Sequence, residues 1–325
     1  MTAIVDIHAE ETIPSLSKMT KNLKDLTIST ETIRCDLCES ESHTPLFNKM
    51  RHNINLTTVI CENCSLIYTN PQPTKECLDS FYQDYYHLFH QRKGADESYV
   101  SKSARIDARR IKALQKVINF EDNNNKVLEI ACGVGEFISQ LSKITKWEIS
   151  GIEPGKESHA ICESKKLNVE KINFENFSTE IKFDLLACFF AVDHLRSPKQ
   201  FFEKCNSILK EDGLLFVEIG NFNKPFKPYS ELQQLPKLFS FTPIILVNYL
   251  KCSGFEIIYY NEIRDVLSVV VRKTAIKSKN IIKTDIDSLK ARIYWVDKIQ
   301  TLAEKVPTWF SISRSIKNAL HKISV

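Results

Sequence analysis

Residues 127–153 constrain the fold most, because they read as a buried strand, a glycine turn, a helix and a second strand in immediate succession. Gly133 and Gly135 form the turn, and the second strand ends at Glu153. Glycines let a backbone pass close to a ligand, and a helix N-terminus presents free N–H groups. A carboxylate at the end of the second strand can accept hydrogen bonds from ribose hydroxyls. The segment therefore predicts a nucleotide-type crevice, and the alternative is an ordinary strand-to-helix turn with a surface glutamate.

The same strand–helix alternation continues along the chain. Strands are expected at 126–131, 148–153, 169–173, 183–190 and 213–219. Helices are expected at 135–145, 156–167, 198–209 and 242–253. Two further strand-like runs, 255–262 and 266–272, are so close that they can pair only antiparallel. The pattern predicts an α/β fold, a doubly wound and mostly parallel seven-stranded sheet that ends in an antiparallel hairpin.

The remaining segments suggest five units. They are a flexible tail at 1–30, a four-cysteine domain at 31–75, an aromatic-rich helical connector at 76–120, a cofactor-binding domain at 121–275 and C-terminal helices at 276–325. Pro307 is expected to divide the last unit into two helices. Residues 221–240, rich in aromatics and prolines, are a candidate lid.

Two Cys-x-x-Cys pairs lie in the second unit, Cys35 with Cys38 and Cys61 with Cys64, with 22 residues between the pairs. Each pair suits a tight knuckle, and four thiolates suit the tetrahedral coordination of Zn²⁺. Such a site has no open position, so its role is expected to be structural. Four free or disulfide-bonded cysteines are the alternative, and an iron–sulfur cluster also uses four cysteines.

The glycine loop closely resembles the first motif of class I S-adenosylmethionine-dependent methyltransferases, and the resemblance extends over about 100 to 275. Ile138 is bulky where a dinucleotide loop has a third glycine, and Ala131 stands where many relatives have the first glycine. The resemblance implies S-adenosylmethionine as cofactor, with Glu129 facing its aminocarboxypropyl end. The cofactor-binding residues it implies are Glu129, Ala131, Gly133, Gly135, Glu153, Pro154, Asn173 and Phe190.

The cysteine pairs, residues 66–73 and the aromatic run from Phe81 to Tyr85 resemble the N-terminal zinc-binding domain of the sugar C-methyltransferases. That family implies a sugar or nucleotide-sugar acceptor in glycan or natural-product biosynthesis. Leu235 stands where the family has a histidine that is a candidate base. Methylation of oxygen or nitrogen therefore fits as well as methylation of carbon.

Methyl transfer to a hydroxyl or a carbon acid needs a base near the carboxyl edge of the sheet. Asp193 and His194 follow the fourth strand, and relatives often have Glu-His there; a structural role for the pair is equally open. Tyr82 is expected either to line the acceptor pocket or to pack one domain on another, and Tyr229 is a candidate to replace the missing histidine.

Composition excludes some function classes. The net charge of +4 is too balanced to argue for nucleic acid or an anionic membrane, and the apolar runs are too short to cross a bilayer, so a cytoplasmic protein with no membrane partner is expected. The resemblance to the methyltransferases implies a small-molecule substrate. An RNA methyltransferase is an alternative, but Cys35 to Cys64 holds two basic residues against four acidic ones. A non-catalytic module that binds S-adenosylmethionine is a third interpretation, favoured by Leu235.

Overall fold

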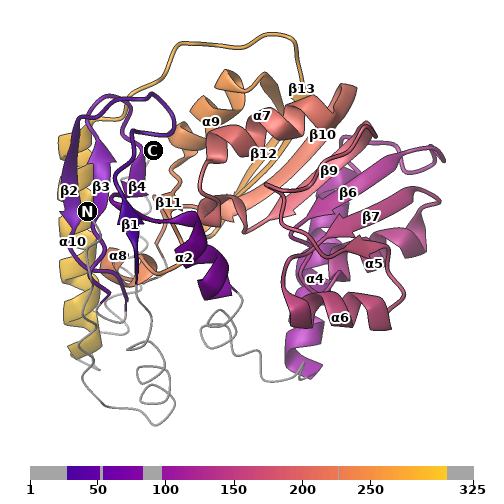
Figure 1. Ribbon diagram of the computed structural model, residues 1–325, viewed down its shortest axis with the longest axis horizontal. Helices are drawn as coiled ribbons and strands as arrows, with labels where there is room; N and C mark the ends of the chain where they lie inside the picture. The colour runs from indigo at the N-terminus through magenta and orange to yellow at the C-terminus, as the bar shows by residue number, and fades with distance from the viewer. Residues whose placement is uncertain (1–27, 52–53, 83–96, 226, 306–325) are drawn as a thin grey trace.

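The computed structural model describes residues 28–51, 54–82, 97–225 and 227–305 (Figure 1). Its strands are β1 (Thr30–Glu31), β2 (His43–Phe47), β3 (Thr58–Cys61), β4 (Ile67–Thr69), β5 (Gln72–Pro73), β6 (Lys126–Ile130), β7 (Glu148–Ile152), β8 (Val169–Glu170), β9 (Phe183–Phe189), β10 (Leu209–Gly220), β11 (Phe239–Ser240), β12 (Phe255–Ile263) and β13 (Val266–Lys273). Its helices are α2 (Lys75–Ser80), α4 (Glu97–Leu114), α5 (Glu136–Ile144), α6 (Lys156–Ser164), the short 3₁₀ helix η3 (Val192–His194), α7 (Pro198–Ile208), α8 (Tyr229–Leu232), α9 (Pro243–Cys252) and α10 (Ile286–Lys305).

A seven-stranded sheet with the order β12-β13-β10-β9-β6-β7-β8 forms the centre of the molecule. β10, β9, β6, β7 and β8 run parallel to one another, whereas β13 pairs antiparallel with both β10 and β12. The predicted mostly parallel sheet and its closing hairpin are therefore confirmed. β8 is shorter than expected, because the chain leaves the sheet after Glu170 and turns at Asn173.

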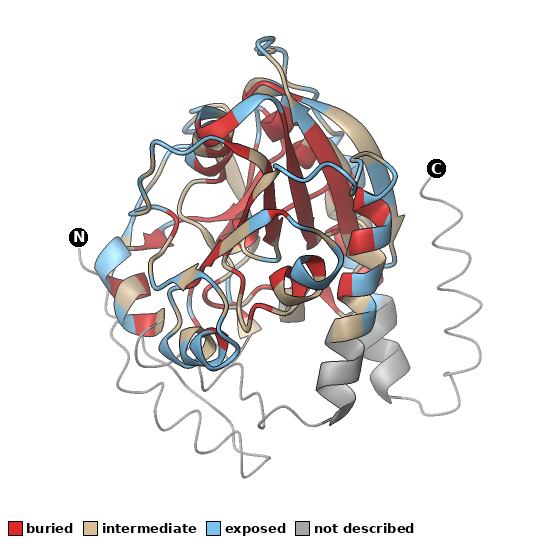
Figure 2. Cartoon of the chain, turned by 90° about the vertical axis from the view of Figure 1, so that its right-hand side faces the viewer, coloured by how far each residue is buried: buried red, intermediate tan, exposed pale blue. Residues whose placement is uncertain are grey.

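Alternate residues of the central strands face opposite layers of helices, as the two-residue period of a strand requires. Leu186 and Cys188 pack with α7 and α9, whereas Leu185 and Ala187 pack with α4, α5 and α6. Figure 2 shows the strands buried while the covering helices keep one exposed side. Both faces are apolar because both are covered, which explains the continuous hydrophobic run of residues 185–190.

A second sheet contains the cysteine segment, and its strand order is β11-β4-β3-β2. Its edge strand β11 comes from residues 239–240, which lie between the central strand β10 and helix α9. This pairing, with the burial of Leu235 and Phe239, holds the end of the 221–240 segment against the second sheet. The predicted lid is therefore wrong for that end of the segment, because main-chain hydrogen bonds fix it.

Helix α10 packs on the outer side of the second sheet (Figure 1). Its Leu289, Ile293 and Val296 share a core with Ile60 and Ile67. Residues 306–325, including the predicted break at Pro307, lie outside the described residues. So does the predicted tail, apart from residues 28–30. Within the described residues, every helix is too short or too polar to cross a bilayer.

Candidate active site and cysteine centre

The glycine loop joins β6 to α5 through residues of positive φ, a conformation that favours glycine. The φ angles are +56° at Ala131, +58° at Gly133 and +69° at Gly135. A Cβ atom at Gly135 would lie 2.5 Å from Leu167 Cδ1, so that glycine is required by packing. A Cβ atom at Gly133 would meet nothing within 4 Å among the described residues, so the backbone there borders open space. Gly133 is therefore free to approach a ligand.

Glu153 follows β7 and faces the glycine loop. Its carboxylate accepts hydrogen bonds from the Gly133 N–H at 2.9 Å and from the Gly155 N–H at 2.8 Å. These contacts hold the acidic group at the carboxyl edge of the sheet, beside the open space over Gly133. A carboxylate in this place suits the two hydroxyls of a ribose.

Glu129 lies inside β6 and is buried, with 4% of its surface exposed. Its Oε2 has no hydrogen-bond partner among the described residues. Burial raises the pKa of Glu129 well above its ordinary value, and the nearby Arg110 acts in the opposite direction. Buried polar atoms normally have a hydrogen-bond partner. The ammonium group of an aminocarboxypropyl chain can donate the hydrogen bond that Glu129 Oε2 lacks. The residues of the loop thus fit S-adenosylmethionine.

Pro154, Asn173 and Phe190 each follow a strand of the central sheet, after β7, β8 and β9 respectively. Their positions share the carboxyl edge of the sheet with Gly133 and Glu153. Phe190 has a φ of +55° and is 44% exposed, and its N–H donates to the carbonyl of Glu218 on β10. The structure therefore gathers the residues of the predicted cofactor site along one edge.

His194 lies in η3, directly after β9, with Asp193 and Tyr82 beside it. Its Nδ1 is 3.5 Å from the Tyr82 hydroxyl and its Nε2 is 3.9 Å from Asp193 Oδ1. Burial lowers the pKa of His194 below 6.5, Asp193 acts against this shift, and the positive charge of Lys237 adds to it. The imidazole is therefore neutral at pH 7 and has one nitrogen able to take a proton.

Tyr229 does not join this group. It is completely buried in a separate core with Phe222 and residues of α10, and its ring centroid is 4.5 Å from that of Phe222. Its backbone N–H donates to the carboxylate of Asp297 on α10. Tyr229 thus anchors α8 to α10. Because it lies in this separate core, its position does not support the prediction that it replaces the missing histidine at the acceptor.

Sequence reasoning missed a buried charge cluster between α4 and β10. Glu218 of β10 is 1% exposed and accepts hydrogen bonds from Arg109, Arg110 and Ser268. Arg110 also pairs with Asp107, and its guanidinium lies 3.8 Å from the centre of the Phe189 ring. An acid inside the apolar run of residues 214–219 was the signal available, since such an acid needs a buried partner. The cluster fixes α4 over the carboxyl edge of the sheet.

The four cysteines of the second sheet lie together, with all sulfur atoms within 4.8 Å of one another. Cys35 and Cys64 sulfurs are 3.4 Å apart, and those of Cys38 and Cys61 are 3.5 Å apart. Four sulfurs bound tetrahedrally to one zinc ion at about 2.3 Å lie about 3.8 Å from each other. The donor set and its spacing therefore fit one zinc ion.

The two knuckles have the same backbone. The residue after each second cysteine, Glu39 or Ser65, has a φ near the left-handed region, at +63° and +66°. Its N–H donates to the carbonyl of the first cysteine of the pair, Cys35 or Cys61. Two equivalent turns thus aim two pairs of sulfurs at one point.

Asp36, inside the first knuckle, fastens the cysteine centre to the central domain. Its carboxylate accepts hydrogen bonds from the Ser197 hydroxyl, the Lys199 N–H and the Tyr249 hydroxyl, the last two at 2.9 Å. Ser197 caps α7, which begins four residues after His194. The first knuckle therefore holds the helix that follows the candidate acceptor site.

Replacing Asp36 with alanine is expected to lower the free energy of unfolding by about 3 kcal/mol, because three donors in part-buried hydrogen bonds lose their acceptor. Denaturant unfolding measures the change. The matched control is Glu41→Ala, which removes an ion pair with Arg34 whose side chains are 70% and 74% exposed. Exposed pairs contribute little, so equal losses in the two variants would contradict the role assigned to Asp36.

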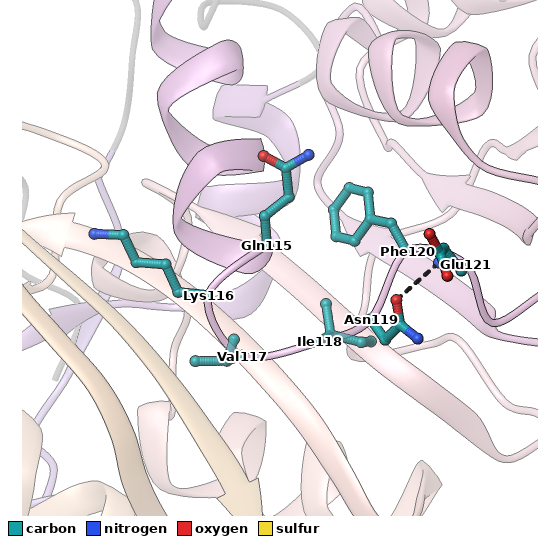
Figure 3. Close-up of a pocket in the computed structure, with 7 residues that line it drawn as sticks. All are labelled: Gln115, Lys116, Val117, Ile118, Asn119, Phe120 and Glu121. Atoms are coloured by element: carbon teal, nitrogen blue, oxygen red, sulfur yellow. Dashed lines mark hydrogen bonds between the residues drawn. The ribbon is translucent and has the colours of Figure 1, made fainter.

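Two hollows lie at the other edge of the sheet. One is lined by residues 115–121, in the connection from α4 to β6 (Figure 3). The other includes Asn125, Asp184 and Gly213, which lie near the amino ends of β6, β9 and the regular part of β10. Open α/β sheets bind ligands at the carboxyl ends of their strands, so neither hollow competes with the site at Gly133.

Comparison with known proteins matches the central part of the chain to a family. Residues 102–258 match the model of a methyltransferase domain family. The chain is 33% identical over 120 residues to a ubiquinone biosynthesis O-methyltransferase of Glaesserella parasuis, covering 32% of this chain and 48% of that protein. It is 25% identical over 130 residues to (S)-coclaurine N-methyltransferase of Papaver somniferum, covering 37% of each.

Among solved structures, the chain is similar to SAM-bound CalS10, an amino pentose methyltransferase of Micromonospora echinaspora. The TM-score is 0.44 at 16% identity, over 58% of this chain and 96% of that one. The chain spans about half the length, or less, of the curated relatives named above. Residues 102–258 of this chain are thus similar to a methyltransferase domain.

Proposed function

We propose that the chain transfers a methyl group from S-adenosylmethionine to a small hydroxylated acceptor, with a sugar or nucleotide-sugar favoured. Three observations carry the proposal: the open space at Gly133, the Glu153 carboxylate bound to the Gly133 N–H, and the buried, unpaired oxygen of Glu129 on the strand before the loop. When bound, S-adenosylmethionine supplies an electrophilic methyl group on a sulfonium. Glu153 would hold the ribose, and Glu129 would accept a hydrogen bond from the amino group.

The acceptor is proposed to lie near Asp193 and His194, which follow β9 at the same edge. The neutral imidazole of His194 would take the proton of an acceptor hydroxyl as its oxygen forms a bond to the methyl carbon. An oxygen acceptor is supported by the similarity to ubiquinone biosynthesis O-methyltransferases, which include that of Glaesserella parasuis. A carbon or nitrogen acceptor could be methylated at the same carboxyl edge of the central sheet.

We further propose that the cysteine centre binds one structural zinc ion, and that residues 31–75 with β11 form the unit that carries it. Residues 121–275 would form the unit that binds the cofactor. Asp36 joins the two units through α7. The division would give the cysteine centre a supporting role, since closed four-cysteine sites have no open position for chemistry.

The pH dependence of methyl transfer tests the assignment of His194. Because burial lowers the pKa of His194 from 6.5, most of the imidazole is unprotonated above pH 6.5. We expect kcat/KM to fall as the pH falls through this lowered pKa, and to be flat from there to neutral pH. His194→Gln is expected to lower kcat by about a hundredfold or more and to remove the acidic limb.

Activity is measured as transfer of labelled methyl from S-adenosylmethionine to a panel of sugar nucleotides and phenols. Tyr82→Phe serves as a matched control, since it keeps the ring and removes the hydroxyl 3.5 Å from His194 Nδ1. It is expected to shift the acidic limb without abolishing turnover. If His194→Gln retained both the rate and the acidic limb, His194 would not be the base.

A further inference from the structure

Lys237 had no role in the sequence-based prediction, yet its ammonium lies between the ends of two neighbouring central strands. Lys237 Nζ is 3.6 Å from Asp193 Oδ2, and Asp193 follows β9. On the side of β10, a Cβ atom at Gly220 would lie 3.8 Å from the same nitrogen. Lys237 therefore occupies the carboxyl edge of the sheet, on which the cofactor residues also lie.

The backbone holds Lys237 in this position. Its N–H donates to the Gln234 carbonyl at 2.7 Å, and the N–H of Leu238 donates to the Asp193 carbonyl at 2.9 Å. Directly after Leu238, β11 pairs with β4 of the second sheet. The lysine is thus presented by main-chain contacts on both sides, and its orientation does not depend on the ion pair alone.

The ion pair leaves hydrogen-bonding capacity unused. The side chains of Asp193 and Lys237 are only 8% and 15% exposed, and 3.6 Å is longer than a charge-assisted hydrogen bond. Asp193 Oδ1 is buried and accepts no hydrogen bond from any described residue. A buried ion pair stabilises a fold only when its remaining donors and acceptors are satisfied. A polar ligand could satisfy both residues of the ion pair, with a hydrogen-bond donor for Asp193 and an acceptor for Lys237.

We propose that Asp193 and Lys237 bind two neighbouring oxygens of the acceptor, at least one of them a hydroxyl. Asp193 Oδ1 accepts the hydrogen bond of the hydroxyl, and Lys237 donates to the adjacent oxygen. Sugar rings and aromatic diols share this chemistry, whereas a compound with one hydroxyl satisfies only half of the pair. This inference rests on the proposed methyl transfer and names the acceptor class for the same site.

The hydroxyl bound to Asp193 keeps its proton in that hydrogen bond, so the neighbouring hydroxyl, whose oxygen Lys237 contacts, is the one that gives its proton to His194. His194 Nε2 is 3.9 Å from the same Asp193 oxygen that accepts the hydroxyl hydrogen bond. Lys237 is a specificity residue in this arrangement, because it touches the acceptor without taking its proton. Its positive charge also keeps His194 neutral.

The test compares Lys237→Met and Asp193→Asn with wild type. The matched control is Lys210→Met, because Lys210 also pairs with an aspartate, Asp184, but lies at the amino end of β10. Calorimetry gives the affinity for S-adenosylhomocysteine, and the loaded protein is then titrated with UDP-glucose, with catechol and with phenol. Lys237→Arg keeps the charge and is expected to rescue part of the affinity.

We expect the affinity of both variants for S-adenosylhomocysteine to stay within about twofold of wild type, while the affinity for the diol falls about tenfold or more. UDP-glucose and catechol distinguish a sugar from an aromatic acceptor. Phenol is expected to bind weakly and to be insensitive to Lys237→Met. Lys210→Met is expected to behave as wild type.

If Lys237→Met does not fold, Gly220→Val provides a second route, because it adds two methyl groups beyond a Cβ position that is itself 3.8 Å from the Lys237 ammonium, and is expected to crowd it. Unchanged diol affinity in these variants would overturn the inference. So would a loaded wild-type protein that binds neither diol. Failure of wild type to bind S-adenosylhomocysteine would instead contradict the proposed function, so the two failures are distinguishable.

Discussion

Replacing Gly133 with alanine is expected to weaken the binding of S-adenosylmethionine about tenfold or more, while the free energy of unfolding falls by only about 1 kcal/mol. The added methyl group meets no described atom within 4 Å, so packing does not oppose it, and the loss of stability comes from the φ of +58°. The methyl group instead enters the open space where the cofactor is proposed to lie. Calorimetry and denaturant unfolding on one preparation measure both effects.

Gly135 differs from Gly133, because a side chain there would collide with neighbouring residues. A Cβ atom there would lie 2.5 Å from Leu167 Cδ1 and 3.1 Å from Cys162 Sγ, at a φ of +69°. Gly135→Ala is expected to lower the free energy of unfolding by about 3 kcal/mol, from overpacking and backbone strain together. If Gly133→Ala bound the cofactor as tightly as wild type, the cofactor would not pass over Gly133.

Removal of one cysteine of the centre is the second large effect expected. Purified protein is expected to contain one zinc ion per chain, and Cys61→Ser is expected to lose it. Structural zinc contributes on the order of 10 kcal/mol to the folding of small zinc domains. The second sheet, which carries Cys61 at the end of β3, is therefore expected to unfold separately and at a lower temperature.

Elemental analysis and calorimetric melting test this expectation. Cys205→Ser is the control, because Cys205 is equally buried but lies on α7, outside the centre. It is expected to keep its zinc and to lose only packing energy. Iron in place of zinc would identify an iron–sulfur cluster instead, and a metal-free wild type that melts like Cys61→Ser would contradict a metal centre.

Much of the fold could be predicted from patterns within short segments of the sequence. Burial on both faces of the sheet is visible as continuous apolar runs such as residues 185–190. The two-residue turn Arg264–Asp265 leaves the flanking strands only an antiparallel pairing, which is the closing hairpin. The glycine loop was predictable for the same reason, because its strand, turn and helix are consecutive in the chain. The clustering of Cys35 with Cys64 also followed from spacing, since two equivalent knuckles tend to face one ion.

Contacts between distant segments were not predictable. β11 joins residues 239–240 to a sheet that begins near residue 43. The sequence of these two residues does not indicate that they pair with β4. Asp36 reaches Tyr249, and Lys237 reaches Asp193, only because that pairing folds the chain back. Leu235 is a further example of a contact that the sequence did not predict. The sequence indicated that a basic residue is missing at position 235, whereas in the structure Lys237, two residues later, lies beside Asp193.

Calorimetric titration of the wild-type chain with S-adenosylhomocysteine tests the central claim most directly. The geometry of Gly133, Glu129 and Glu153 predicts saturable binding at one site per chain, weakened by Gly133→Ala and unaffected by Lys210→Met. Absence of saturable binding by a folded wild-type protein would contradict the account.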